Sequence, residues 1–572
     1  MRSTPADTEL DVEALSAHVA QELERFELPG VEVVVVRDGQ VLFAGGFGRR
    51  DLERDLPVTP RTVFAHGSTG KGFTSFVVGQ LVDEGLLDWD RPIREYLPDF
   101  RLAEAVASER ITLRDLLCHR SGVPRHDLAW LANPGLDRGE LVRRMRFLDL
   151  SRDLRTLFQY CNFGYVAAGF VCGHVTGSSY EQQLRERIFE PLGMSTTYLS
   201  TAEVTRLADH AQPYAERDGR IVPITYREAS NVAPAGGINS CADDTARWLL
   251  CQLGGGELDG RRLISAGSLA TTHSVQFPLS GLPIPEDRAF RVHGYAMGWI
   301  VATYRGRHHL SHAGGIDGFT TEFQLLPAEK IGVAVSGNRN TAFPAALCRS
   351  ILDQLLGEEA RDWASEMREQ HEQMMAAMKE QSEKGRKVVP GTSPAHPLGD
   401  YANRYEHPGY GTLQVEAEPG GLAISLGTLG FHVSHRHYET YDLKWRDLGD
   451  LSYTATFVTD ESGSVSEVRC SFEPSTETVR FKRRADERLS DETFLQGLAG
   501  RYTLGPVTVE VAVEAGPKLV GYQNGARIEL VPSGGLTFKV PMAPGLNLEF
   551  LLDASGRATA IATSQGTLTR AD

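Results

Sequence analysis

Strand patterns lie at both ends of the first 357 residues and helical patterns lie between them, an order that few folds accommodate. Residues 31–36 and 41–47 flank an Asp-Gly turn and predict a β-hairpin. Residues 75–270 are mostly helical in pattern, residues 297–335 return to short strands, and residues 344–356 predict a closing helix. Because strands from both ends need hydrogen-bonding partners, we expect an α/β fold in which one antiparallel sheet is flanked by helices and carries a helical subdomain.

The residues beyond this segment predict further domains, because 572 residues exceed what one hydrophobic core supports. With residues 1–357 as the first domain, residues 358–394 combine a charged helix with a proline-rich stretch and predict a helical linker. Residues 395–487 and 488–572 then form two units of similar length. They share a short pattern, in which Leu398 to Tyr401 match Leu498 to Tyr502 and Phe457 matches Phe550. Alternating strands and Gly-rich turns in both units predict two small antiparallel β-barrels.

The charge balance excludes some classes of partner. The chain carries 59 basic and 75 acidic side chains, a formal net charge of −16, which disfavours nucleic acid and anionic membranes as partners.

The longest run of the chain without charged or strongly polar side chains, residues 163–173, is far shorter than the ~20 residues that cross a bilayer. The first residues lack the apolar segment of a signal peptide, and the seven cysteines are scattered and odd in number. We therefore expect a cytoplasmic protein with reduced thiols, whose oligomeric state the sequence does not predict.

A serine and a lysine stand three residues apart where a strand pattern gives way to the apolar helix that includes Phe73. At a helix start this spacing places Ser68 and Lys71 on one face. A lysine can take the serine proton only when burial or a neighbouring cation keeps its amine neutral. Ser68 is the only serine of the chain with a lysine three residues on. Gly67 and Gly70 permit a sharp turn, and the first amides of the helix offer positive potential to an oxyanion.

Two further stretches supply what a serine–lysine pair requires. Tyr160 can carry a proton to a leaving group, and Asn162 can orient both the lysine and the substrate. His312 and Gly314 lie on a predicted strand that ends in glycines, where a substrate backbone can pair with the strand edge. The backbone N–H of the next residue, Gly315, is predicted to form an oxyanion hole with the N–H of the nucleophilic serine, Ser68.

Taken in order, Ser68-x-x-Lys71, Tyr160-x-Asn162 and His312-x-Gly314 resemble the three motifs of the penicillin-recognising serine hydrolases. That superfamily includes class C β-lactamases, DD-peptidases, D-aminopeptidases and related esterases. The similarity extends over roughly residues 10–357. A hydrolase domain followed by lipocalin-like barrels is similar to the D-aminopeptidase group, and this similarity implies that a barrel loop can reach the cleft and restrict its substrates.

The resemblance also implies a mechanism. Neutral Lys71 takes the proton of Ser68, Ser68 attacks an acyl carbonyl, and Tyr160 protonates the leaving group while Asn162 orients. His312 departs from the pattern, since β-lactamases usually carry a lysine at that position. An imidazole is mostly neutral at pH 7 and cannot hold a substrate carboxylate as a fixed ammonium would, so efficient β-lactam hydrolysis is disfavoured.

We therefore expect a serine hydrolase that forms an acyl-enzyme on Ser68 and cleaves amide bonds in small peptides or amino-acid amides, a class that includes D-configured substrates. An esterase, an acyltransferase or a cyclising thioesterase could use the same residues. A non-catalytic ligand-binding protein on the same fold is the alternative of another class. The expected partner is a small peptide, amide or ester, and we expect no metal and no cofactor.

Overall fold

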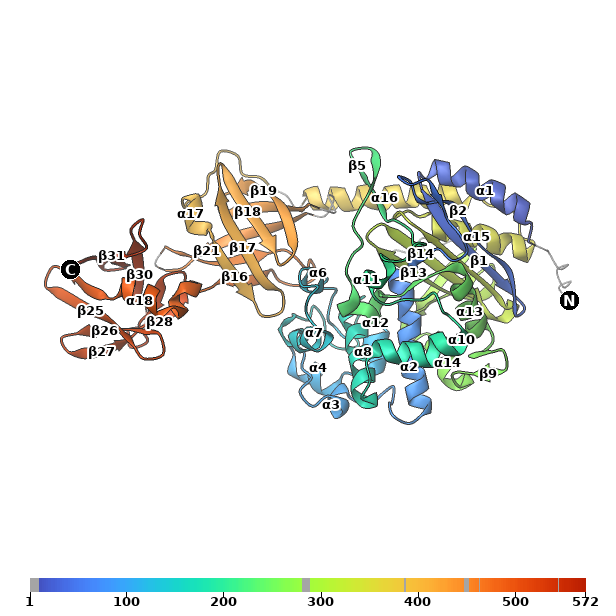
Figure 1. The fold of residues 1–572 in the computed structure, drawn as a ribbon, viewed down its shortest axis with the longest axis horizontal. Coiled ribbons are helices and arrows are strands. Elements are labelled where there is room, and N and C mark those ends of the chain that lie inside the picture. The colour runs from blue at the N-terminus through green and yellow to red at the C-terminus, as the bar shows by residue number, and fades with distance from the viewer. Residues whose placement is uncertain are drawn as a thin grey trace. The chain divides into compact units, whose positions relative to one another are not determined.

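The computed structural model describes residues 10–279, 289–384, 387–446, 452–461, 463–543 and 545–571. The chain divides into two compact units (Figure 1). The first unit comprises residues 1–130 and 134–386, and the second comprises residues 131–133 and 387–572. Among the helices of the described ranges, none combines the length and the apolar composition needed to cross a bilayer.

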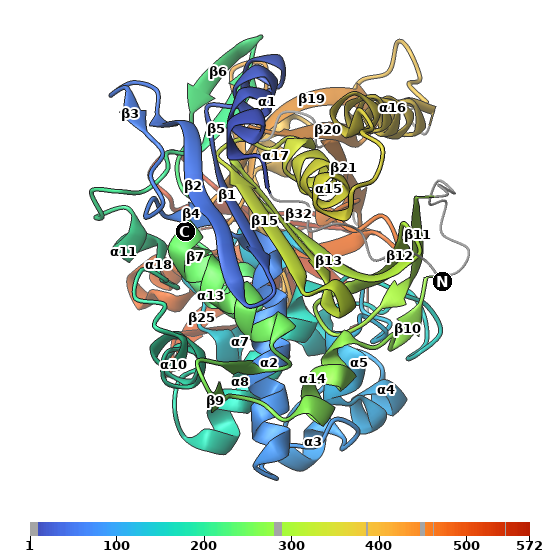
Figure 2. The ribbon, with the colours of Figure 1, turned by 90° about the vertical axis from the view of Figure 1, so that its right-hand side faces the viewer.

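A nine-stranded antiparallel sheet forms the centre of the first unit (Figure 2), in the order β10-β11-β12-β13-β14-β15-β1-β2-β3. Strand β1 pairs with β15, so the two ends of the segment share one sheet as predicted. The hairpin β1–β2 and the β12–β15 meander are likewise confirmed. The strands are β1 Gly30–Arg37, β2 Gln40–Asp51, β3 Leu56–Pro57, β10 Phe277–Pro278, β11 Phe290–Tyr295, β12 Ile300–Tyr304, β13 Arg307–Ile316, β14 Phe319–Leu326 and β15 Ile331–Gly337.

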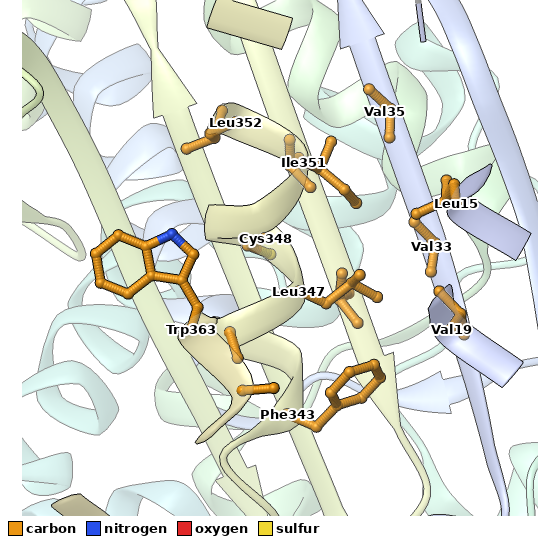
Figure 3. Packing of buried hydrophobic residues seen from close by; sticks show 14 of the residues in the cluster. Leu15, Val19, Val33, Val35, Phe343, Leu347, Cys348, Ile351, Leu352 and Trp363 are labelled. Atoms are coloured by element: carbon orange, nitrogen blue, oxygen red, sulfur yellow. The ribbon is translucent and has the colours of Figure 1, made fainter. Parts of the chain in front are cut away.

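Helices cover both faces of this sheet. On one face, α1 (Val12–Arg25) and α15 (Phe343–Leu356) pack on β1 through a cluster that includes Val33, Val35 and Ile351 (Figure 3). On the other face, α13 (Ala242–Leu253) contacts β1. Strand β1 is therefore buried almost throughout, which explains its continuous valine run, since a strand covered on both faces needs no polar side.

The predicted linker begins as part of this core. Helix α16 (Trp363–Lys384) opens with Trp363, which is 2% exposed and joins the cluster beside α15. Its indole N–H donates to Asp353 Oδ2 over 2.8 Å. Farther along α16, Met374 and Met375 are exposed. The hydrophobic helix start therefore anchors the predicted linker on the core of the first unit.

The helical subdomain surrounds α2 (Lys71–Asp83) and α8 (Asn162–Thr176), both largely buried. Beside the end of β15, where Tyr214 N–H donates to Asn338 O, the chain also forms a hairpin that the sequence analysis missed, β5 (Tyr214–Arg217) with β6 (Arg220–Pro223). Its Asp-Gly turn has positive φ at both residues, 51° and 71°, the backbone that a two-residue hairpin requires. The other helices are α3 Ile93–Tyr96, α4 Ala105–Arg110, α5 Leu113–Leu117, α6 Leu128–Leu131, α7 Arg138–Arg144, α9 Tyr180–Leu184, α10 Glu190–Leu192, α11 Thr201–Val204, α12 Ala233–Gly236 and α14 Ala266–His273.

The second unit contains two antiparallel β-structures, coloured orange to red in Figure 1. Strands β16 to β23 form a closed barrel. The following nine strands form a nearly closed barrel whose edge strands, β27 and β28, are joined through the single residue Leu530. The strands are β16 Asn403–His407, β17 Gly411–Glu418, β18 Gly421–Leu426, β19 Leu429–His437, β20 Thr440–Trp445, β21 Ser452–Thr459, β22 Val465–Cys470, β23 Val479–Arg483, β24 Gly500–Leu504, β25 Val507–Glu514, β26 Lys518–Gln523, β27 Ala526–Glu529, β28 Val531–Gly534, β29 Thr537–Lys539, β30 Asn547–Leu552, β31 Ala558–Thr563 and β32 Gly566–Arg570.

The structure corrects the alignment of the repeat. Tyr502 donates its hydroxyl proton to the carbonyl four residues before it, over 2.6 Å, and its ring packs on Phe550. In the first barrel Tyr405, not Tyr401, makes the equivalent hydrogen bond, over 2.8 Å, and packs on Phe457. Tyr401 is also buried and also packs on Phe457, so the hydrogen bond, and not the ring contact, identifies Tyr405 as the equivalent of Tyr502.

A buried acid on the central sheet leads to a pH-dependent stability. Glu322 of β14 is 7% exposed, and burial raises the pKa of its carboxyl to about 7. Between about pH 4.5 and 7 the folded state therefore holds a proton that the unfolded state has released, so stability falls as pH rises. The loss of stability amounts to about 3 kcal/mol in total.

We expect Glu322→Gln to remove most of this pH-dependent loss of stability, measured as the free energy of unfolding in urea at pH 5 and pH 8. The exposed Glu24→Gln on α1 serves as the control, and an unchanged pH dependence in Glu322→Gln would contradict the assignment.

Candidate active site

The turn that carries Ser68 exposes this residue alone. Strand β4 (Phe64–Ala65) leads into a 3-10 turn, Gly67–Gly70, and then into α2, so the predicted strand-to-helix junction is present. All of residues 62–81 are described, and each is buried except Ser68, which is partly exposed. A partly exposed serine in an otherwise buried turn is positioned to meet a substrate.

Two glycines let strand β13 run directly against this turn. Gly67 has φ +54°, and a Cβ there would lie 2.9 Å from the backbone nitrogen of Gly315. A Cβ on the buried Gly314 would overlap the carbonyl oxygen of His66 and lie 3.1 Å from Ser68 N. The third predicted motif thus brings the main chain of Gly315 beside that of Ser68, where the two predicted oxyanion donors belong. Their role in catalysis stays a prediction.

Gly314→Ala tests this close approach. The added methyl group has no room, so either β13 or the nucleophile turn must shift, and we expect a loss of about 3 kcal/mol in stability with severe loss of activity. Gly315→Ala is the matched control for stability, because a Cβ there meets nothing within 4 Å. Thermal unfolding of both variants measures the difference in stability, and we expect the lower melting temperature for Gly314→Ala. Equal melting temperatures would show that the contact does not constrain the turn.

Lys71 has the environment of a neutral amine. Its Nζ lies 2.9 Å from Asn162 Oδ1, 2.6 Å from Ala235 O and 3.1 Å from Ser68 Oγ. Burial, together with the positive charge of Arg125, holds the pKa of Lys71 well below its usual 10.5. A neutral amine has two N–H donors, which the two carbonyl oxygens accept, and one lone pair. That lone pair is left for the hydroxyl proton of Ser68.

Tyr160 stands beside both reacting groups. Lys71 Nζ lies 4.7 Å from the centre of its ring, and the ring of His119 packs at 4.3 Å. Burial raises the pKa of the phenol above 10, an effect that its interaction with the Ser68 hydroxyl reduces but does not cancel. The phenol is therefore protonated at neutral pH, the state that a proton donor needs.

Asp127 is a site residue that the sequence analysis missed. Its Oδ1 accepts hydrogen bonds from Asn162 Nδ2 and Trp130 Nε1, each over 2.9 Å, and its Oδ2 accepts from Arg125 Nε over 2.7 Å. Because a carboxylate can only accept, it fixes the Asn162 amide with Oδ1 toward Lys71. Asp127 belongs to no recognisable sequence motif, because only the fold brings this loop residue into contact with its partners.

Both ring nitrogens of His312 have hydrogen-bond partners within the protein. Its Nδ1 lies 2.6 Å from Ala313 O and its Nε2 lies 2.9 Å from Tyr295 OH. Burial lowers the pKa of His312 to about 3, so the ring is neutral. A carbonyl can only accept, which places the proton on Nδ1 and makes Nε2 the acceptor of the tyrosine O–H. Neither nitrogen is left to donate to a substrate carboxylate, in line with the weak anion binding expected for histidine here.

The described residues bring together Ser68, Lys71, Tyr160, Asn162, His312, Gly314 and Gly315. The whole described part of the chain contains no group of three or more His, Cys, Asp or Glu side chains arranged to hold a metal ion. All seven cysteines are free and buried, and burial raises the pKa of the Cys118 and Cys161 thiols to about 12, so neither resembles a nucleophile.

Comparison with known proteins matches both parts of the chain. The Beta-lactamase family matches residues 15–356, and a domain of unknown function, DUF3471, matches residues 387–483. Unguisins hydrolase ungD' of Aspergillus campestris is 31% identical over 419 residues, 69% of this chain and 76% of that protein. Penicillin-binding protein 4 of Amycolatopsis lactamdurans is 28% identical over 343 residues, 58% of this chain and 86% of that protein. A solved structure, the octameric penicillin-binding protein homologue from Pyrococcus abyssi, shares the fold with a TM-score of 0.56 and 24% identity, covering 83% of this chain and all of that one.

Proposed function

Because the chain belongs to the Beta-lactamase family, we propose that it is a serine hydrolase that forms an acyl-enzyme on Ser68 and cleaves amide bonds in small peptides or amino-acid amides. One observation carries the proposal: Ser68 is partly exposed, and its hydroxyl lies 3.1 Å from an amine whose two protons are directed to other acceptors. A hydroxyl beside such a lone pair is an activated nucleophile.

The geometry supports the following sequence of steps. Lys71 Nζ takes the Ser68 proton as Oγ attacks the acyl carbonyl, and the backbone amides of Ser68 and Gly315 stabilise the resulting oxyanion. The C–N bond breaks as Tyr160 gives its proton to the departing nitrogen, and Lys71 returns the first proton to the phenolate. Water then attacks the Ser68 ester with the same residues acting in reverse, which releases the acid.

Hydrolysis is also supported by a relative at 31% identity that is named a hydrolase of unguisins. The neutral His312 disfavours the β-lactam specialisation, because it offers no cation to a substrate carboxylate. Amide cleavage therefore fits the site better than efficient β-lactam hydrolysis.

The experiment is a substrate panel with purified protein, in which D- and L-amino-acid amides and short acyl esters are compared for wild type and Ser68→Ala. The proposal predicts amide turnover by wild type and none by the variant. Fast ester cleavage without amide cleavage would favour an esterase, and product transfer to an added amine in preference to water would favour an acyltransferase. A Ser68 that neither turns over substrate nor reacts with a fluorophosphonate would favour a ligand-binding protein.

A further inference from the structure

The segment that carries Tyr160 has no regular secondary structure. Residues 158–161 belong to no helix or strand, and α8 begins only at Asn162. The hydrogen bonds of a helix or a sheet therefore do not hold the phenol in place. A proton donor has to stay within hydrogen-bond reach of the departing nitrogen, so other contacts must fix this segment.

Both chain neighbours of Tyr160 donate backbone hydrogen bonds to one residue, His119. Gln159 N–H donates to His119 O over 2.7 Å, and Cys161 N–H donates to His119 Nδ1 over 3.1 Å. His119 lies just after α5 and is fully buried. Its two acceptors therefore fix the backbone on either side of Tyr160.

The imidazole of His119 also packs on the phenol ring itself. The two ring centres lie 4.3 Å apart, with 36° between the ring planes. The rings of Phe158 and Tyr295 enclose the imidazole further, with centres 5.6 Å and 4.9 Å from its own. Because a buried ring with these neighbours has little room, its packing restricts the position of the phenol as well.

Two features of His119 are unfavourable for folding. Burial holds the pKa of the imidazole well below its usual 6.5, so the ring is neutral at pH 7. Since Nδ1 accepts a backbone N–H, the single ring proton lies on Nε2, which has no hydrogen-bond partner among the described residues. The backbone φ is +60°, in the left-handed region that few residues other than glycine adopt. A residue that keeps both features is a candidate for a role at the site.

We propose that His119 is a positioning residue, which holds Tyr160 where its phenol can protonate the departing nitrogen. The inference rests on the proposed function and adds a residue to its mechanism. His119 exchanges no proton in this step: the Tyr160 O–H bond breaks, an N–H bond forms on the departing nitrogen, and the C–N bond to the acyl carbon breaks. The imidazole acts only through the position that it gives to the phenol.

His119→Asn tests this role, because asparagine tolerates a left-handed backbone and its Oδ1 can replace Nδ1 as the acceptor. The variant loses the ring that packs on Tyr160. The measurement is kcat/KM for an amide and for a p-nitrophenyl ester of the same acyl group, since only the amide needs the proton. We expect the amide-to-ester ratio to fall about 10- to 100-fold, as for a catalytic group displaced by about 1 Å. His119→Ala also lacks the acceptor and should lower the ratio further.

A second measurement adds His119→Asn to Tyr160→Phe. Without the phenol hydroxyl there is no proton donor to position, so the amide-to-ester ratio should change little further. His309→Asn is the matched control. His309 is equally buried, but its three-residue offset from His312 places it on the opposite face of β13. This variant should keep the wild-type ratio, whatever stability it loses.

The outcomes separate this inference from the proposed function. If wild type turns over amides, an unchanged amide-to-ester ratio in His119→Asn would overturn the role of His119 alone. So would an undiminished effect of this substitution in the Tyr160→Phe background. A wild-type protein without turnover, whose Ser68 also resists a neutral fluorophosphonate, would overturn the proposed function and this inference together.

Discussion

Lys71→Met is expected to slow acylation of Ser68 by about 100- to 10,000-fold, the range typical of a lost general base. Methionine has a similar length and suits a fully buried site, but it offers no lone pair of comparable basicity to the Ser68 proton. The variant leaves Asn162 Oδ1 and Ala235 O without their donor, which costs about 1–3 kcal/mol each and is partly offset because a buried amine is removed. Single-turnover acylation with an amide substrate measures the effect.

The pH dependence of kcat/KM shows which protonation state of Lys71 is active. The neutral form of Lys71 is the active one, so kcat/KM of wild type should rise with pH through the lowered pKa of Lys71 and reach its plateau well below pH 10.5. The variant should lose this rising limb. Lys444→Met, at an exposed position on β20, is the control and should behave as wild type. If Lys71→Met kept this rise of kcat/KM with pH, the rise would belong to another titrating group.

Tyr160→Phe is expected to slow cleavage of amides by about 100- to 10,000-fold and to affect activated esters far less. An amine is a poor leaving group until it is protonated, whereas p-nitrophenolate departs without a proton. The ring and its packing on His119 are kept, so the variant removes the phenol hydroxyl alone. Comparing kcat/KM for an amide and a p-nitrophenyl ester of the same acyl group therefore measures the contribution of proton donation.

Tyr165→Phe is the control for this substitution. Its ring centre lies 5.3 Å from Lys71 Nζ, but its hydroxyl donates to Leu117 O over 2.6 Å and is directed away from the reaction. We expect its amide-to-ester ratio to stay near that of wild type. An equal loss on both substrates in Tyr160→Phe would show that the tyrosine positions the site without giving a proton.

The sequence predicted the parts of the fold that depend on local pattern. The hairpin, the meander and the closing helix follow from residue periodicity, and the union of both chain ends in one sheet follows because their strands need partners. The resemblance to the penicillin-recognising serine hydrolases is confirmed by the family match. The hairpin β5–β6 could have been found from its Asp-Gly turn, whereas the burial of Trp363 could not be read from a charged segment.

The candidate site was predictable where side chains share a motif and not where contacts come from distant loops. Ser68 and Lys71 are three residues apart, one in the 3-10 turn and one at the start of α2, so their contact follows from spacing. Asp127 and the carbonyl of Ala235 meet Asn162 and Lys71 only after the loops fold over α2 and α8. A backbone carbonyl leaves no mark in a sequence, which is why the acceptor that completes the neutral-amine arrangement was not foreseen.

The most direct test is the mass of the protein after treatment with a neutral fluorophosphonate, followed by peptide mapping. We expect one covalent adduct, located on Ser68, whose formation slows by about 100-fold or more in Lys71→Met. An unmodified Ser68 in folded wild-type protein, or an adduct that forms equally fast without the lysine, would contradict the activation of this serine by a neutral amine.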